Sequence, residues 1–154
     1  MSDIQQRNAE ILAQIRIKRD ELYNSILGLE RDLSTPARGR VPEWAHGVSE
    51  RLGLVRRALD SHIAVTEGSG GLFDDVMDRA PRLAHEIAAL REEHRSVQSQ
   101  LDEAARGVEA VEDLDGVEGA RVRLLDLIRE LLAHRHRGSE LIYDAYNLDI
   151  GTGD

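Results

Sequence analysis

The sequence contains 154 residues with a formal net charge of -9, 3% aromatic residues and no cysteine. A chain of this length is expected to form one domain, here residues 1–154, that buries roughly two-thirds of its unfolded surface. The negative charge disfavours nucleic acid and anionic membranes as partners, because both bind concentrated basic surfaces. The absence of cysteine excludes disulfides, thiolate metal sites and cysteine nucleophiles.

The N-terminal residues, MSDIQQRNAE, lack the basic and then apolar plan of a secretion signal. No apolar run approaches the ~20 residues that a membrane span requires. We therefore expect a cytoplasmic protein.

Four segments have the pattern of amphipathic helices, over residues 3–33, 42–67, 81–108 and from about 119 to 150. The breaks between them are a proline- and glycine-containing linker at 34–41, a Gly-Ser-Gly-Gly turn at 68–71 and an acidic, turn-like stretch at 108–119. The pattern of residues 71–80 predicts a short helix or lid over one end of the bundle. Trp44 is expected to be buried at the other end and to close it. The pattern therefore predicts an all-α, up-down-up-down four-helix bundle with a short lid helix between the second and third helices.

Each helix has one inward line of residues spaced by three and four. These lines are Leu12, Ile15, Arg19, Leu22, Ile26, Leu29 and Leu33; Leu52, Val55, Leu59, His62 and Thr66; Leu83, Ile87, Leu90, His94, Val97, Leu101 and Ala104; and Leu124, Leu127, Leu131, His134, Gly138, Leu141, Ala145 and Leu148. Arg19 is out of place on an apolar line. It either extends its charged head to solvent or pairs with a buried carboxylate.

Three histidines, His62, His94 and His134, lie on the inward lines of three different helices. A neutral imidazole in an apolar core needs a polar partner, and a shared metal ion would supply one to all three. Hydrogen bonds between buried side chains are the alternative. Glu130 lies one turn before His134 on the same helix face.

These residues lie in two stretches, SHIAVTEGSGGLFDDVMDRAPRLAHEIAALREEHRSVQSQL and LLAHRHRGSELIYDAY. Together they resemble the hemerythrin-like (HHE) cation-binding domain, over roughly residues 52–150. The residues that match the order of the family's motif are His62 with Glu67, Glu93 with His94, and His134 with Glu140. The resemblance implies a non-haem di-iron centre that binds or senses O2, NO or peroxide, with histidines as ligands and carboxylates as bridges.

The ligand set differs from the family pattern at three places. Residues 3–33 contain no histidine, Gln98 stands where a further histidine is expected, and Gly138 and Ser139 stand where an acid is expected. Two hypotheses therefore remain open. One is an iron protein with a small gaseous or oxidant ligand, and the other is a metal-free bundle that acts as a structural or protein-interaction module. Neither requires enzymatic turnover, and both allow a homodimer.

Residue counting along the helices gives an expectation for the heights of the histidines. His62 lies ~8 Å before the end of its helix, and His94 lies ~20 Å into the next long helix. They are level only if the helix of His94 extends past the end of the helix of His62. By the same count, His94 and His134 can lie at the same height in the bundle. This predicts a site smaller than the three-histidine one, made of His94, His134 and Glu130, with Glu93 or Tyr23 as a further member. We expect His46 and His85 in solvent and His136 paired with Glu140 on the surface.

Overall fold

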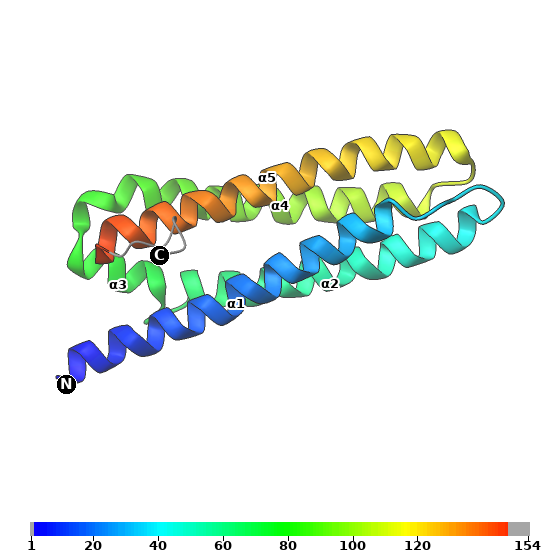
Figure 1. Cartoon of the computed structure of the whole chain (residues 1–154). Helices are drawn as coiled ribbons and strands as arrows, with labels where there is room; N and C mark the ends of the chain where they lie inside the picture. Colours follow the sequence, from blue (N-terminus) through cyan, green and yellow to red (C-terminus); the bar gives the residue numbers. More distant parts are fainter. Residues whose placement is uncertain (1, 148–154) are drawn as a thin grey trace.

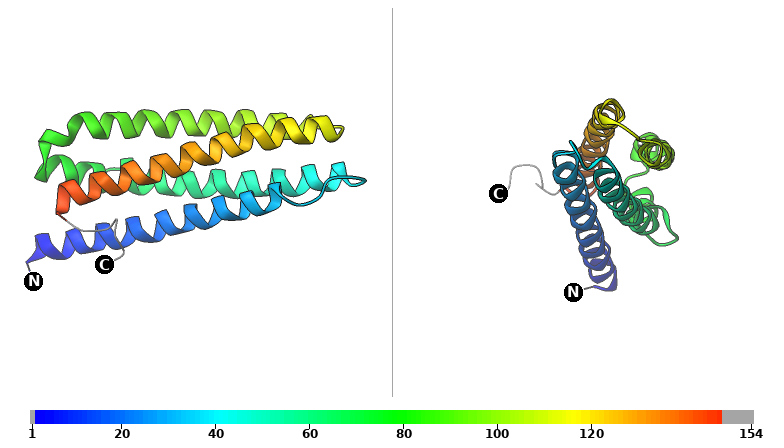
Figure 2. Two further views of the ribbon diagram at one scale, coloured as in Figure 1. Left: turned by 45° about the horizontal axis from the view of Figure 1, so that its top comes forward. Right: turned by 90° about the vertical axis from the view of Figure 1, so that its right-hand side faces the viewer.

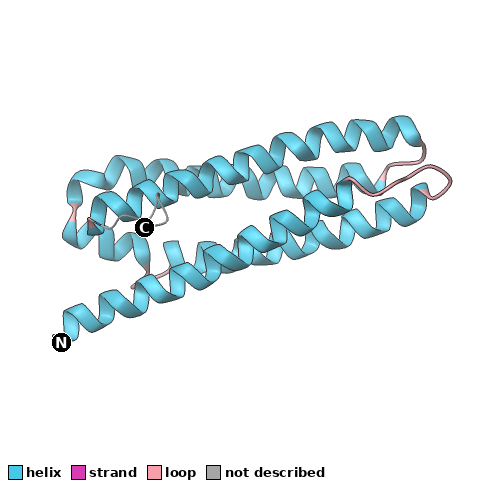
Figure 3. Cartoon of the chain, in the orientation of Figure 1, coloured by secondary structure: helices cyan, strands magenta, loops and turns pink. Residues whose placement is uncertain are grey.

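The computed structural model describes residues 2–147, and every regular element in that range is a helix (Figures 1 and 3). The elements are α1 (Asp3–Leu33), α2 (Val41–Glu67), α3 (Leu72–Arg79), the 3-10 turn η1 (Pro81–Leu83), α4 (Ala84–Glu109) and α5 (Leu114–Tyr146). The four long helices alternate in direction, with α3 between α2 and α4. The predicted four-helix bundle with a short lid helix is therefore confirmed. Leu148, predicted on the last inward line, lies outside the described residues.

Local chemistry explains where the long helices begin and end. Ser2 and Gln5 form a capping box at the start of α1, and Asn147 adopts the left-handed conformation (φ 56°) that closes α5. The expected start of the last helix near Gly119 was wrong. The Asp113 carboxylate accepts a hydrogen bond of 2.8 Å from the backbone nitrogen of Gly116, so α5 begins within the acidic stretch.

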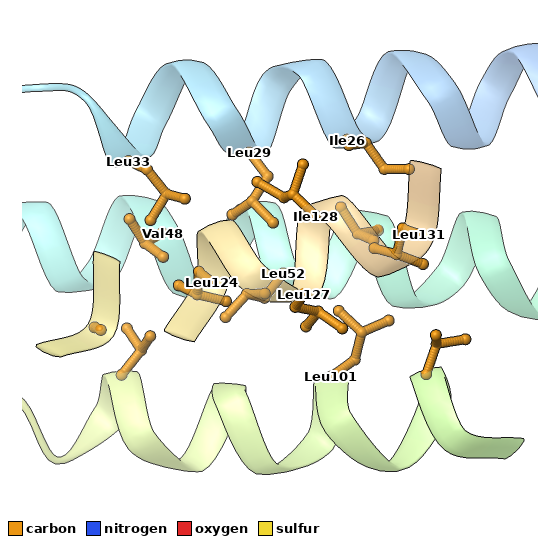
Figure 4. Close-up of a cluster of buried hydrophobic side chains, with 14 of the residues drawn as sticks. Ile26, Leu29, Leu33, Val48, Leu52, Leu101, Leu124, Leu127, Ile128 and Leu131 are labelled. Carbon is orange, nitrogen blue, oxygen red and sulfur yellow. The ribbon is translucent and has the colours of Figure 1, made fainter. Parts of the chain in front are cut away.

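The larger part of the core fills the half of the bundle at the α1–α2 and α4–α5 connections. Figure 4 shows Leu29, Leu52, Leu101, Leu124 and Leu127 among the side chains that converge there from all four long helices. We call this whole cluster the apolar half. It extends along the bundle from Ile26 and Leu131, near the middle, to Trp44 at the end with the two connections. The predicted burial of Trp44 at this end is confirmed, because its side chain belongs to the same cluster.

The other end of the bundle is built around α3. Helix α4 begins well beyond the end of α2, and α3 lies in the space that this leaves (Figure 1). Phe73 and Val76 of α3 pack in a second apolar cluster with Ile15, Leu90 and Leu141. The extension of α4 past α2 is the arrangement that residue counting required for His62 and His94 to be level.

The four long helices lie roughly parallel over most of their length, and α1 diverges from α5 towards its N-terminus (Figure 2). Among the described residues, no helix is both long and apolar enough to span a membrane.

Candidate metal centre

One polar residue from each long helix lies between the two apolar clusters. Along α5, Leu131 belongs to the apolar half, His134 follows, and Leu141 belongs to the cluster around α3. The same order holds on the other helices, with Arg19 on α1, His62 on α2 and His94 on α4 at the boundary. We call these four residues the polar layer. Its three histidines are buried, as their places on the inward lines predicted.

The three imidazoles face one another. The ring centroids of His94 and His134 are 4.6 Å apart, and the His62 centroid lies 5.3 Å from that of His94 and 5.8 Å from that of His134. One nitrogen from each ring can be chosen so that all three lie within 4.8 Å of one another. This spacing is short enough for the three nitrogens to share one metal ion.

Two carboxylates orient two of the rings. The Nδ1 of His94 lies 2.5 Å from Glu67 Oε2, and the Nδ1 of His134 lies 2.8 Å from Glu93 Oε1. A carboxylate beside Nδ1 keeps the proton on that nitrogen and leaves the Nε2 lone pair free. Metal-binding histidines are commonly held in this way by a carboxylate behind the ring.

An arginine contacts the outer side of each of these carboxylates. Arg91 Nη1 lies 3.3 Å from Glu67 Oε1, and Arg137 donates a hydrogen bond of 2.8 Å from Nε to Glu93 Oε2. The two glutamates are therefore held from both sides, and each faces a positive charge on its outer side.

Two ring nitrogens of the cluster, His62 Nδ1 and His94 Nε2, are fully buried and have no hydrogen-bond partner. Within residues 2–147 the only other buried side-chain atom of this kind is Trp44 Nε1, in the apolar half. Buried nitrogens without partners are rare because they have lost water without replacement. Two in one cluster indicate that these rings have a nitrogen to offer to a group that is not part of the protein.

The imidazoles are neutral at ordinary pH. Burial, and then the neighbouring histidines, lower the pKa of His62 to about 3, and burial followed by the charge of His134 lowers that of His94 to about 3. Burial also lowers the pKa of His134, although Glu93 opposes the shift. Partial burial would raise the pKa of Glu93, but hydrogen bonds from Arg137 and His134 outweigh it and the net shift is downward. Neutral imidazoles bind metals, whereas imidazolium does not.

A small cavity borders all three histidines. Its volume is about 20 Å³, which is room for one or two water-sized groups. Arg19, Phe73 and Gly138 also line it. The Phe73 ring is stacked on the imidazole of His94, with centroids 6.0 Å apart and an interplanar angle of 10°. The lid helix α3 therefore closes one side of the site with an apolar ring.

Arg19 follows neither of the two expectations for it. Its Nη2 donates hydrogen bonds to Ser139 Oγ and, at 3.0 Å, to the carbonyl oxygen of Arg135, both on α5. Arg135 Nη1 donates in return to the Arg19 carbonyl oxygen at 3.1 Å. No carboxylate of the described residues lies within ion-pair distance of Arg19. Arg19 as a whole is half-buried, and it lines the cavity beside the histidines.

The structure brings five of the seven predicted site residues together: His62, His94 and His134, with Glu67 and Glu93 at hydrogen-bond distance from two of the rings. It does not bring Glu130 and Glu140 to the cluster. Glu130 is exposed and accepts a hydrogen bond of 2.7 Å from Gln100 across the α4–α5 surface. Glu140 points about 120° away from His134 around α5.

The surface histidines lie where they were expected. His136 Nε2 is 2.7 Å from Glu140 Oε1 in an exposed pair, and His46 and His85 are exposed. Tyr23 packs under the Arg135 guanidinium rather than beside His94.

The donor set fits a metal ion. Three neutral imidazoles on three helices, two of them supported by carboxylates and two carrying a fully buried nitrogen without a partner, supply ligands that transition metals prefer. The chain was also compared with protein-family models, with curated proteins and with solved structures, and none of the three comparisons found a significant match. The polar layer is thus a candidate metal centre whose assignment rests on its own geometry.

Proposed function

We propose that the protein binds a single transition-metal ion through His62, His94 and His134. The observation that carries this proposal is the set of three buried ring nitrogens within 4.8 Å of one another. A second ion would need further ligands, and two of the carboxylates considered for that role, Glu130 and Glu140, lie on the surface. The remaining two, Glu67 and Glu93, contact Nδ1 atoms.

The metal we propose is non-haem iron, and the ligand is a small molecule such as O2, NO or peroxide. Imidazole is a ligand of iron, and the resemblance to hemerythrin-like domains favours iron over zinc or copper. The cavity of about 20 Å³ beside the three rings limits an additional ligand to a few atoms. When bound, such an ion supplies an open coordination position for a small ligand.

The residues of the chain have separate roles in this proposal. The three histidines hold the ion, and Glu67 and Glu93 keep protons on the Nδ1 atoms of His94 and His134. Phe73 and Leu72 of α3 exclude bulk water from the cavity. Because α3 forms a separate short helix between two breaks in the chain, it is the element best placed to admit a ligand.

The alternative is a metal-free bundle that serves as a structural or interaction module. In such a bundle each buried imidazole nitrogen needs a partner from the protein or from ordered water. The Nδ1 of His62 and the Nε2 of His94 have none in the protein, and a shared metal ion is a partner that all three converging rings could use, so the geometry favours the metal centre.

The test is reconstitution with ferrous iron under argon, followed by desalting and measurement of metal content and the near-ultraviolet spectrum in air. We expect about one iron per chain in the natural protein. The variant His62→Leu should bind none, yet be at least as stable as the natural protein without metal, because leucine removes an unpartnered buried nitrogen. The matched control is His85→Gln, which changes an exposed histidine and should retain the iron.

Three results would reject the proposal. They are failure of the natural protein to retain iron, retention of iron by His62→Leu, and equal loss of iron in His85→Gln. Two irons per chain would instead contradict the single-ion assignment.

A further inference from the structure

Arg19 is a cation without an anion. It is half-buried on the inward line of α1, and no carboxylate of residues 2–147 lies within 4 Å of its guanidinium. Only Nη2 makes hydrogen bonds to the described residues, and Nε and Nη1 are not among the fully buried atoms without partners, so both can donate to a further group. A partly buried charge of this kind is unfavourable unless it is paired.

Arg19 lies at the same small cavity as the three imidazoles, and its charge is close enough to help lower the pKa of His62 and of His134. Arg19, His62, His94 and His134 all line this cavity. Arg19, His62 and His134 also line a second, smaller cavity on the side of Tyr23. A ligand that enters the larger cavity is therefore within reach of both the candidate metal centre and Arg19.

The local charge also favours an anion. A divalent ion among three neutral imidazoles adds positive charge to a layer that already contains Arg19. Glu67 and Glu93 lie behind the rings, but each is already paired with an outer arginine, Arg91 or Arg137. The carboxylates thus leave the cavity side of the layer positively charged, which attracts a small anion.

We propose that Arg19 is a specificity-determining residue that selects small anionic ligands, such as azide, nitrite or hydroperoxide, at the open position of the metal centre. This inference rests on the proposed function, because it requires the metal. It differs from that function in the class of ligand: a neutral gas gains little from a guanidinium, whereas an anion gains a charge-assisted hydrogen bond.

The test uses the full-length, iron-loaded protein under argon, with metal content measured before and after each titration. Azide is the anionic probe and nitric oxide the neutral one, each followed by its spectral change. We expect Arg19→Gln to weaken azide binding about 10–100-fold, the range of a lost charge-assisted hydrogen bond. Nitric oxide binding should change less than about threefold, since it has no charge to lose.

Two further variants make the test specific. Arg19→Lys keeps the charge and should recover part of the azide affinity, and Arg16→Gln removes an exposed arginine of the same helix and should bind azide as the natural protein does. Azide should also raise the melting temperature of the iron-loaded natural protein more than that of Arg19→Gln. This readout does not depend on any spectral band.

Equal azide affinity in the natural protein and in Arg19→Gln would overturn the inference. A parallel loss of azide and nitric oxide binding would also overturn it, because Arg19 would then only support the fold of the site. In both cases an unchanged iron content would leave the metal centre itself intact. Failure of the natural protein to bind iron would reject the proposed function and this inference together.

Discussion

The two ends of the bundle use the same four helices for different purposes. In the apolar half, leucine, isoleucine and valine from α1, α2, α4 and α5 fill the core, and Leu29 and Leu59 are fully buried. Towards α3 the same inward lines carry Arg19, His62, His94 and His134, and two buried nitrogens have no partner. The comparison indicates that the apolar half supplies stability, while the polar layer contributes less to it, as expected of a region with the proposed metal-binding role.

The largest expected effect lies in the apolar half. Leu124→Ala should lower the free energy of unfolding by about 3–4 kcal/mol, because it opens a cavity in a closely packed core. Urea denaturation should give the same loss with and without iron, and the iron content should stay unchanged. A loss of iron in this variant would show that the two regions are not independent.

The next effect concerns the support of one imidazole in the polar layer. Glu67→Gln removes the carboxylate charge behind His94 Nδ1 and should weaken iron binding about 10–100-fold in a chelator competition. The matched control is Glu92→Gln, an exposed glutamate of α4. If both variants bind iron equally well, Glu67 has no part in orienting His94.

The polar layer should also make the metal-free protein sensitive to acid. The pKa values of His62 and His94 fall from 6.5 to about 3 in the fold, so the unfolded chain binds more protons between those values. The contribution of these two groups to stability is thus complete only well above pH 6.5, and it is lost progressively as the pH falls through 6.5 towards 3. From pH 8 to pH 6 the two groups together should lower the free energy of unfolding by roughly 1.5–2 kcal/mol.

This decline can be measured by denaturation in the presence of a chelator. The variant His62→Leu should have a shallower pH dependence than the natural protein over the same range. An identical dependence in both would contradict the neutral, buried state assigned to His62.

The smallest effect concerns the space that Gly138 leaves beside the histidines. A Cβ at this position would meet nothing within 4 Å, so Gly138→Ala should stabilise α5 by about 0.5–1 kcal/mol. Because Gly138 lines the cavity, the variant should also bind azide less tightly. Gly47→Ala, at an equally open position of α2, should increase stability by a similar amount without changing azide affinity.

The sequence predicted which residues face inward and, except for α5, approximately where the long helices begin and end, but not how the helices are placed along one another. The spacing of three and four placed His62, His94 and His134 on buried lines, because the helical period determines which side of a helix a residue occupies. Their relative heights depend on where α4 starts with respect to the end of α2. That extension follows from the packing of Phe73 and Val76 of α3, which no helical period encodes.

The sequence also did not predict which histidine, if any, each glutamate contacts. Glu130 lies one turn from His134 on α5, but its side chain turns outward to Gln100. Glu93 comes from another helix and reaches His134 across the α4–α5 contact. Spacing along one helix gives a side chain its direction only approximately, and hydrogen bonds between helices decide where a long glutamate finally lies.

The position of the metal ion is the most direct test of the account. Crystals of the iron-loaded protein, recorded at the iron absorption edge, should show one anomalous peak among the imidazole nitrogens of His62, His94 and His134. A peak at surface carboxylates such as Glu130, or no peak among the three rings in protein that retains iron, would contradict the assignment of the polar layer as a metal centre.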